Sequence, residues 1–242
     1  MRLIPRQELI RHKARRRELV VTDAEQLPGS FVRLMLGGDL AGFSSPGPAD
    51  HAKLIIGGGV GRFYTPIPMG DSVAVDIFLH PNGPLACWAS ALPVDDDVIL
   101  AGPRGSKLVP TDMTHLVAIA DCSAFPAAAR WIKETDVPID LIAVGPGLPY
   151  LGSLLDSDRI RVQQLPEDRS GAAILASLQS IEPRNGTFVW AAGEATSLIP
   201  ARRYLRNESG LDRQSIAMQG YWKFGRADHD HHAPIDERDP DD

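Results

Sequence analysis

Cysteine is scarce in this chain, and no apolar stretch is long enough to cross a bilayer. The two cysteines, Cys87 and Cys122, lie in different segments and form neither a CxxC pair nor a disulfide framework. A membrane-spanning helix needs about 20 mostly apolar residues, and the basic start of the chain lacks the apolar core of a signal peptide. We therefore expect a cytoplasmic protein in a reducing compartment.

An excess of positive charge is also missing. The formal net charge is −6, which argues against a general nucleic-acid binder and against a polyanionic partner. The length of 242 residues and the 43% hydrophobic content are sufficient for two domains with buried cores. The basic segment Arg11–Arg17 is expected to be a solvated leader without a function of its own.

The first part of the chain consists of short β-rich runs separated by Gly, Pro and Asp. This spacing predicts a six-stranded antiparallel β-barrel. The runs are Glu18–Val21, Phe31–Leu36, His51–Ile56, Arg62–Ile67, Val73–Leu79 and Asp97–Ala101.

After Pro110 the pattern changes to apolar strands that alternate with amphipathic helices, which predicts an α/β domain with a parallel sheet. We place the domains at residues 1–110 and 111–227, followed by an acidic, His-rich tail, 228–242, that is expected to be disordered. The expected strands are His115–Ala120, Ile139–Val144, Ile160–Gln164 and Thr187–Ala192, and the expected helices are Pro126–Thr135, Gly171–Ile181 and Thr196–Glu208.

The segment Arg62–Thr65 contains the side-chain types that a flavin needs close together. In an extended strand Arg62 and Tyr64 project to the same side, so that one can bind a phosphate while the other covers an aromatic ring. His80 and the Gly83–Pro84 turn follow one strand later, and such a turn brings backbone amides close to an anion. These features predict a flavin reductase.

Two short loops follow strands of the predicted parallel sheet. Ligands bind at the carboxyl edge of such sheets, so both loops are expected to face a nucleotide. The loops contain Asp121, Cys122, Ser123 and Ala124, and Gly193, Glu194 and Ala195.

Taken together, these features resemble the siderophore-interacting protein family, which comprises flavin-dependent ferric-siderophore reductases related to ferredoxin-NADP reductases. The similarity runs from Arg16 to about Arg226. Its landmarks are Arg16–Val21, Phe31–Phe43, Asp50–Leu54, Trp190–Glu194 and Gly220–Gly225.

The resemblance implies that FAD is held by the barrel. A second arginine usually stands two residues after the Arg62–Thr65 segment in this family, and here the position is Ile67. The family's Gly-Pro-Ala-Ser block corresponds to Gly83–Ala86, without the hydroxyl. The implied FAD contacts are Arg62, Phe63, Tyr64, Thr65, His80, Gly83, Pro84, Leu85 and Ala86.

The resemblance further implies that NAD(P)H binds at the two loops of the parallel sheet. Cys122 and Ser123 replace a glutamate and a threonine of the family pattern. The pair Arg202–Arg203 could bind the 2′-phosphate of NADPH or form a solvated helix face, which leaves NADH and NADPH undecided.

The implied activity passes electrons from NAD(P)H through FAD to Fe(III) in a siderophore or another chelate. Lys53, Arg130 and Lys223 are candidate substrate-binding cations, and three unrelated surface charges are an equally good interpretation. No general acid or base and no metal site is assigned, because the cofactors carry the chemistry. We expect a monomer that binds neither nucleic acid nor membrane, although the sequence itself does not determine the oligomeric state.

Two alternatives remain open at this point. One is a non-catalytic member of the family that binds a siderophore or a nucleotide without turnover. The other is a flavin reductase that serves a protein electron acceptor.

Overall fold

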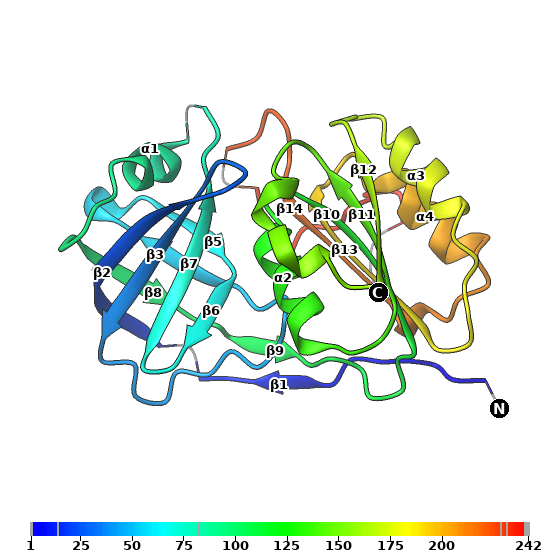
Figure 1. Cartoon of the computed structure of the whole chain (residues 1–242), viewed down its shortest axis with the longest axis horizontal. Helices are drawn as coiled ribbons and strands as arrows, with labels where there is room; N and C mark the ends of the chain where they lie inside the picture. Colours follow the sequence, from blue (N-terminus) through cyan, green and yellow to red (C-terminus); the bar gives the residue numbers. More distant parts are fainter. Residues whose placement is uncertain (1, 14, 82, 228, 231, 240–242) are drawn as a thin grey trace.

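The computed structural model describes residues 2–13, 15–81, 83–227, 229–230 and 232–239, and it contains two main sheets side by side (Figure 1). A curled antiparallel sheet occupies the first part of the chain, and a parallel sheet flanked by helices occupies the second. A β-barrel followed by an α/β domain was the fold predicted from the sequence, and the structure confirms it.

The curled sheet has seven strands in the order β5-β4-β8-β2-β3-β7-β6. Its two outermost strands, β5 and β6, are consecutive in the chain and separated only by Thr65, so the sheet returns on itself at that residue. The strands are β2 (Arg16–Leu27), β3 (Phe31–Gly38), β4 (Ala52–Ile55), β5 (Gly61–Tyr64), β6 (Pro66–Met69), β7 (Ser72–Phe78) and β8 (Asp97–Ala101).

The strand count differs from the six predicted because the expected strand Arg62–Ile67 is two strands. Pro66 lacks a backbone N–H, and the chain bends at Thr65, whose side chain is buried. Each half then pairs with a different neighbour, β5 with β4 and β6 with β7. The structure also contains a helix that the sequence did not predict, α1 (Pro84–Ser90), whose Leu85 and Ala89 pack into the barrel core.

The parallel sheet has the order β12-β11-β10-β13-β14. Alternate residues of β10 enter two cores: Leu116, Ala118 and Ala120 pack with α2, and Val117 and Ile119 pack with α3 and α4. The elements are β10 (His115–Asp121), α2 (Phe125–Glu134), β11 (Ile139–Val144), β12 (Ile160–Leu165), α3 (Ala172–Gln179), β13 (Thr187–Glu194), α4 (Ile199–Asn207) and β14 (Ile216–Trp222).

The sequence predicted four strands in this sheet, and β14 is a fifth. Its burial pattern is mixed, so it does not show the continuous apolar run of a central strand. β14 lies at the edge beside β13 and pairs with it from Val189 with Ile216 to Glu194 with Trp222, with a register shift between Gly193 and Glu194. This edge strand brings Trp222 to the carboxyl end of the sheet.

The N-terminal segment before β2 contacts both parts of the molecule. The sequence predicted a solvated leader over Arg11–Arg17, and of these residues Arg11 lies in a strand, β1 (Leu9–Arg11), and Arg16 and Arg17 lie in β2. Strand β1 pairs with β9 (Gly105–Lys107), and the segment runs beneath both halves of the molecule (Figure 1). The backbone N–H of Leu3 donates to Asn185, and Ser215 donates to the carbonyl of Pro5. The segment therefore joins the barrel side to the amino ends of β13 and β14.

The C-terminal segment lies partly outside the described residues, which exclude Asp228, His231 and residues 240–242. In the described part, Ile235 is buried in the core that contains α3 and α4. Asp236 pairs with Arg203 and Asp239 with Arg202 at 2.6 and 2.5 Å. The expected disorder of residues 228–242 and the domain boundaries stay predictions. Among the described residues, no helix is long and apolar enough to span a membrane.

A buried polar network connects the first residues of three parallel strands. His115 Nε2 lies 2.7 Å from Asp140, and its Nδ1 lies 3.0 Å from the hydroxyl of Thr187. Because a carboxylate only accepts hydrogen bonds, Nε2 carries the proton and the hydroxyl donates to Nδ1. Arg161 supplies a second contact to Asp140 at 3.0 Å.

This network predicts a loss of stability in mild acid. Burial lowers the pKa of His115 below its ordinary value of 6.5, and the hydrogen bond to Asp140 opposes that shift. The unfolded state therefore takes up a proton as the pH falls through about 6.5 while the folded state does not. The free energy of unfolding should fall between pH 7.5 and 5.5 by up to roughly 1.4 kcal/mol per pH unit from this group.

Urea unfolding of the parent and of His115→Asn at pH 7.5, 6.5 and 5.5 measures the effect. The variant should be less stable at pH 7.5 and should show the smaller pH dependence. Equal pH dependence in the two proteins would contradict the assignment.

Candidate functional site

The strand with the predicted flavin motif presents its side chains as expected. In the β4–β5 ladder, Arg62 lies opposite Leu54 and Tyr64 lies opposite Ala52, so Arg62 and Tyr64 share one side of the sheet. Phe63 lies on the other side. The guanidinium of Arg62 donates to the carbonyl of Gly61 at 2.8 Å.

Tyr64 is partly buried and packs against the barrel core. Burial raises the pKa of its phenol, and the positive charge of Arg62 opposes that shift. The hydroxyl therefore stays protonated at neutral pH and is available as a donor. Thr65, the last residue of the motif, is buried at the bend into β6.

The opposite side of β5 carries an exposed aromatic ring, Phe63, with a lysine and histidine rings near it. Phe63 is 46% exposed, and Lys53 Nζ lies 5.8 Å from the centre of its ring. The ring of His51 meets Phe63 edge-on at 5.5 Å and lies 6.1 Å from the ring of His232 in the C-terminal segment. This face is suited to a planar or anionic ligand.

The predicted Gly-Pro turn begins helix α1. The ring of His80 packs against Gly83 so closely that a Cβ there would lie 2.4 Å from the ring. Leu85 and Ala86 point into the protein and are buried, so their side chains support the barrel, and a ligand at this turn would meet the backbone. Asn82 lies outside the described residues.

At the carboxyl edge of the parallel sheet, Asp121 is the central residue. Its Oδ1 accepts hydrogen bonds from the N–H and hydroxyl of Ser123, and its Oδ2 accepts from the N–H of Glu194 and the indole of Trp222, both at 2.8 Å. Burial raises the pKa of Asp121, and these four donors oppose the shift. One carboxylate thus connects the ends of β10, β13 and β14.

Two glycines let the backbone close around this carboxylate. At Gly193, with φ +152°, a Cβ would lie 2.7 Å from Asp121 Oδ2. At Gly220 a Cβ would lie 2.7 Å from that of Ala195. Neither position accommodates a side chain without movement of its neighbours, so this edge is closely packed.

Glu194 binds backbone groups. Its two carboxylate oxygens accept from the N–H of Ser197 at 2.7 Å and of Phe224 at 3.1 Å. It therefore fixes both the turn into α4 and the segment after β14. Phe224, 56% exposed, carries the guanidinium of Arg169 on its ring at 3.5 Å.

Two further members of the first loop, Cys122 and Ala124, are buried. Cys122 is buried beneath the loop after β11, where a Cβ at Gly147 would lie 2.9 Å from its sulfur. Ala124 is fully buried. An open groove of about 570 Å³ lies next to this loop and is lined by Gly145, Pro146, Gln164, Leu165, Pro166 and Glu167.

The three candidate cations do not form one cluster. Lys53 lies on the barrel beside Phe63, and Lys223 lies after β14, 4.0 Å from Glu237. Arg130 is 5% exposed and donates to protein groups from all three of its nitrogens. The structure therefore places Arg130 inside the protein and away from an open cleft.

Two features at the junction of the sheets were not found from the sequence. Tyr150, after β11, donates to Asp76 in the barrel at 2.5 Å, and Asp76 accepts two bonds from Arg33. Tyr221 has a buried hydroxyl that makes no hydrogen bond within the described part of the chain. The sequence signal that could have pointed to such a contact is an isolated polar residue in an apolar strand, such as Asp76 in β7.

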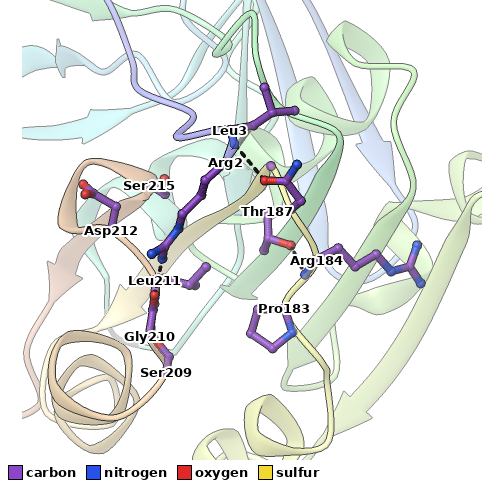
Figure 2. A pocket seen from close by; sticks show the side chains of 12 residues that line it. Arg2, Leu3, Pro183, Arg184, Thr187, Ser209, Gly210, Leu211, Asp212 and Ser215 are labelled. Carbon is purple, nitrogen blue, oxygen red and sulfur yellow. Dashed lines mark hydrogen bonds between the residues drawn. The ribbon is translucent and has the colours of Figure 1, made fainter.

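A second cavity, of about 290 Å³, lies at the amino edge of the parallel sheet (Figure 2). The N-terminal segment forms one wall, with Arg2 donating to the carbonyl of Gly210 and Leu3 to Asn185. Thr187 lies on the strand behind. The two predicted nucleotide loops lie at the carboxyl edge of this sheet, and the predicted flavin motif lies on the barrel. This cavity is therefore not part of the candidate site.

Residues 113–225 match the family model described as siderophore-interacting protein. The NADPH-dependent ferric-chelate reductase of Escherichia coli (strain K12) is 29% identical over 88% of this chain and 95% of its own length.

Solved structures show the same fold. A siderophore utilization protein from T. fusca superposes with a TM-score of 0.80 at 27% identity, over 94% of this chain and all of that chain. The ferredoxin-NADP+ reductase from Plasmodium falciparum has a TM-score of 0.64 at 14% identity, over 84% of this chain and 95% of that chain. The latter match shows a likeness of fold alone.

The environments of the two cysteines predict very different thiol reactivity. Burial raises the pKa of Cys122 to about 11, whereas Cys87 is exposed. Because the thiolate is the reactive form, Cys122 should be inert in the folded protein at pH 8. Titration with Ellman's reagent should show one fast thiol, lost in Cys87→Ser, and a second thiol after denaturation. Two fast thiols in the native parent would refute this.

Proposed function

Because the chain belongs to the siderophore-interacting protein family and is an oxidoreductase, we propose that it is an FAD-dependent ferric-siderophore reductase driven by NAD(P)H. The observation that carries this proposal is that each of the two sheets presents a group of polar side chains. A barrel strand presents Arg62 and Tyr64 on one side, and the neighbouring sheet presents a polar carboxyl edge organised by Asp121.

The residues present fit a flavin. Arg62 supplies a cation, Tyr64 an aromatic ring and Thr65 a hydroxyl, all within four residues of one strand end. The unpaired buried hydroxyl of Tyr221 is a second indication, because such a group costs about 1–3 kcal/mol unless a ligand satisfies it. Ile67 in place of a second arginine lowers the number of cations available to the pyrophosphate.

The roles of the barrel residues follow from their chemistry. Arg62 would bind the pyrophosphate, and Tyr64 would cover the ring system. His80 and the Gly83–Pro84 turn would line the same site with ring and backbone atoms. FAD, when bound, supplies the chemistry: it takes two electrons as a hydride and releases them singly.

The parallel sheet would hold the nicotinamide nucleotide at its carboxyl edge. The loops 121–124 and 193–195 lie there and are fixed by the hydrogen bonds of Asp121 and Glu194. Because these carboxylates are already engaged by protein donors, they orient the loops, and the backbone and Ser123 are left to contact the nucleotide.

The substrate would be an anionic ferric chelate. Lys53 and Phe63 on the barrel and Lys223 after β14 offer charge and aromatic surface for it. Reduction to Fe(II) weakens the hold of oxygen-donor ligands, which releases the iron. We place this activity in the cytoplasm, in a monomer that needs neither nucleic acid nor membrane.

Purified protein loaded with FAD tests the proposal. We expect a retained flavin spectrum, bleaching on anaerobic addition of NADPH or NADH, and recovery of the colour when ferric citrate is added. Flavin that bleaches but is recovered only by a protein acceptor such as ferredoxin would favour the alternative of a reductase serving a partner. A protein that binds no FAD would instead be a non-catalytic binding member of the family.

Arg62 and Ile67 should tune FAD affinity in opposite directions. Arg62→Ala removes a charge-assisted hydrogen bond worth roughly 1.5–3 kcal/mol, which corresponds to about 10- to 100-fold weaker binding. Ile67→Arg should tighten binding by adding a cation near the pyrophosphate. Fluorescence titration with FAD measures both, with the exposed Arg104→Ala as control. Unchanged affinity in both variants would place the phosphate elsewhere.

A further inference from the structure

Arg130 crosses from the parallel sheet's helix α2 to the barrel. Its Nη1 donates to the carbonyl of Pro66 and to the hydroxyl of Ser45, both at 3.0 Å, and its Nη2 donates to the carbonyl of Ser45 at 2.8 Å. Its Nε donates to Glu134 on its own helix at 2.7 Å. The guanidinium is thus fully engaged across the boundary between the two sheets.

The groups that Arg130 binds are themselves fixed. Ser45 donates to Asp50, and Asp50 also accepts from Ser106 at 2.6 Å and from the backbone N–H of Gly47. Ser106 in turn contacts His12 of the N-terminal segment. Because these groups are held from several directions, a shift of the guanidinium would leave buried polar atoms without partners, which is costly.

The hydrogen bond from Arg130 to the carbonyl of Pro66 is important because of where Pro66 lies in the barrel. Pro66 follows Thr65 directly, so its carbonyl lies at the bend where β5 becomes β6. The side chains of Arg62 and Tyr64 are carried by β5, which ends two residues before Pro66. A hydrogen bond at this carbonyl therefore constrains the strand with the proposed flavin contacts.

The other end of the connection is the loop at the sheet edge. α2 begins at Phe125, directly after the 121–124 loop, and its residues from Phe125 to Ile132 are buried. Arg130 lies five residues into the helix, about 7.5 Å along its axis from Phe125. A buried helix of this length transmits position without bending, so Arg130 and the loop move together.

We infer that Arg130 is a positioning residue that sets the separation between the nicotinamide loop 121–124 and the flavin strand Arg62–Thr65. This inference rests on the proposed function. Hydride transfer needs the reacting atoms at about 3–3.5 Å, and a misplacement of 1 Å can cost about 100-fold in rate. One planar guanidinium can hold two carbonyls and a hydroxyl at once, which an ammonium group on a flexible stem does less well.

This role differs from substrate binding, the role expected from the sequence. A side chain that is 5% exposed and donates to four protein acceptors does not reach an anionic chelate without breaking those bonds. The two roles predict effects on different half-reactions. Positioning affects electron transfer from the nicotinamide, and substrate binding affects electron transfer to iron.

Stopped-flow kinetics on FAD-loaded Arg130→Lys and Arg130→Met separate the half-reactions. At saturating NADPH the rate of flavin reduction should fall about 10- to 100-fold, with the dissociation constant for NADPH changed less than about threefold. Reoxidation of dithionite-reduced flavin by ferric citrate should keep its parental rate. Slower reoxidation with normal reduction would overturn the inference in favour of substrate binding, and parental rates of both steps would overturn it outright.

The matched control is Arg159→Met. Arg159 also donates to two backbone carbonyls, those of Val137 and Ile132, but both lie within the α/β part. It should leave the rate of flavin reduction within about threefold of the parent. An equal loss in this control would mean that general destabilisation causes the effect.

Hydrogen–deuterium exchange on the flavin-free protein provides a readout that needs no activity. In Arg130→Lys, and in Arg130→Met if it folds, amides of segments 61–69 and 121–125 should both exchange faster than in the parent, whereas Arg159→Met should affect neither. Faster exchange confined to α2 would overturn the inference. If the parent binds no flavin, the proposed function fails, and this exchange experiment still decides whether Arg130 couples the two segments.

Discussion

Buried hydrogen bonds between the two sheets determine how this molecule is assembled. Arg130 reaches from α2 to Ser45 and Pro66, and Tyr150 reaches from the loop after β11 to Asp76. A polar group in such a place is costly when it loses its partner, so these contacts select one relative position of the sheets more strictly than apolar packing does. The proposed site, to which each sheet contributes residues, would depend on this relative position.

The carboxyl edge of the parallel sheet is also held together by hydrogen bonds to buried polar groups. Asp121 gathers four donors from three strand ends, and Glu194 gathers two more. Both carboxylates therefore accept hydrogen bonds from the protein itself and hold the strand ends together.

The sequence revealed most of the repeating elements of the two sheets. Alternation in β2 to β8 and apolar runs in β10 to β13 were sufficient for both sheets, and the spacing of Arg62 and Tyr64 correctly placed them on one side. The sequence did not reveal the edge strand β14 or the short strand β1, because their stability comes from neighbours distant in the chain. It also could not show that Arg130 is buried, since the helix face that carries it is defined only by the packing of α2 against the barrel.

The N-terminal segment has a consequence for how the chain is made. It contacts Ser106, Asn185 and Ser215, which lie 94, 182 and 210 positions after their partners, so the segment leaves the ribosome before those residues are synthesised. At 5–20 residues per second, about 10 to 40 s pass before Ser215 exists. During that interval Leu9 and Ile10, still 50% and 36% exposed in the finished fold, have no strand β9 or sheet edge to cover them for much of the time. The hydrogen bond between the segment and Ser215 can therefore form only after β10 to β13 have been synthesised.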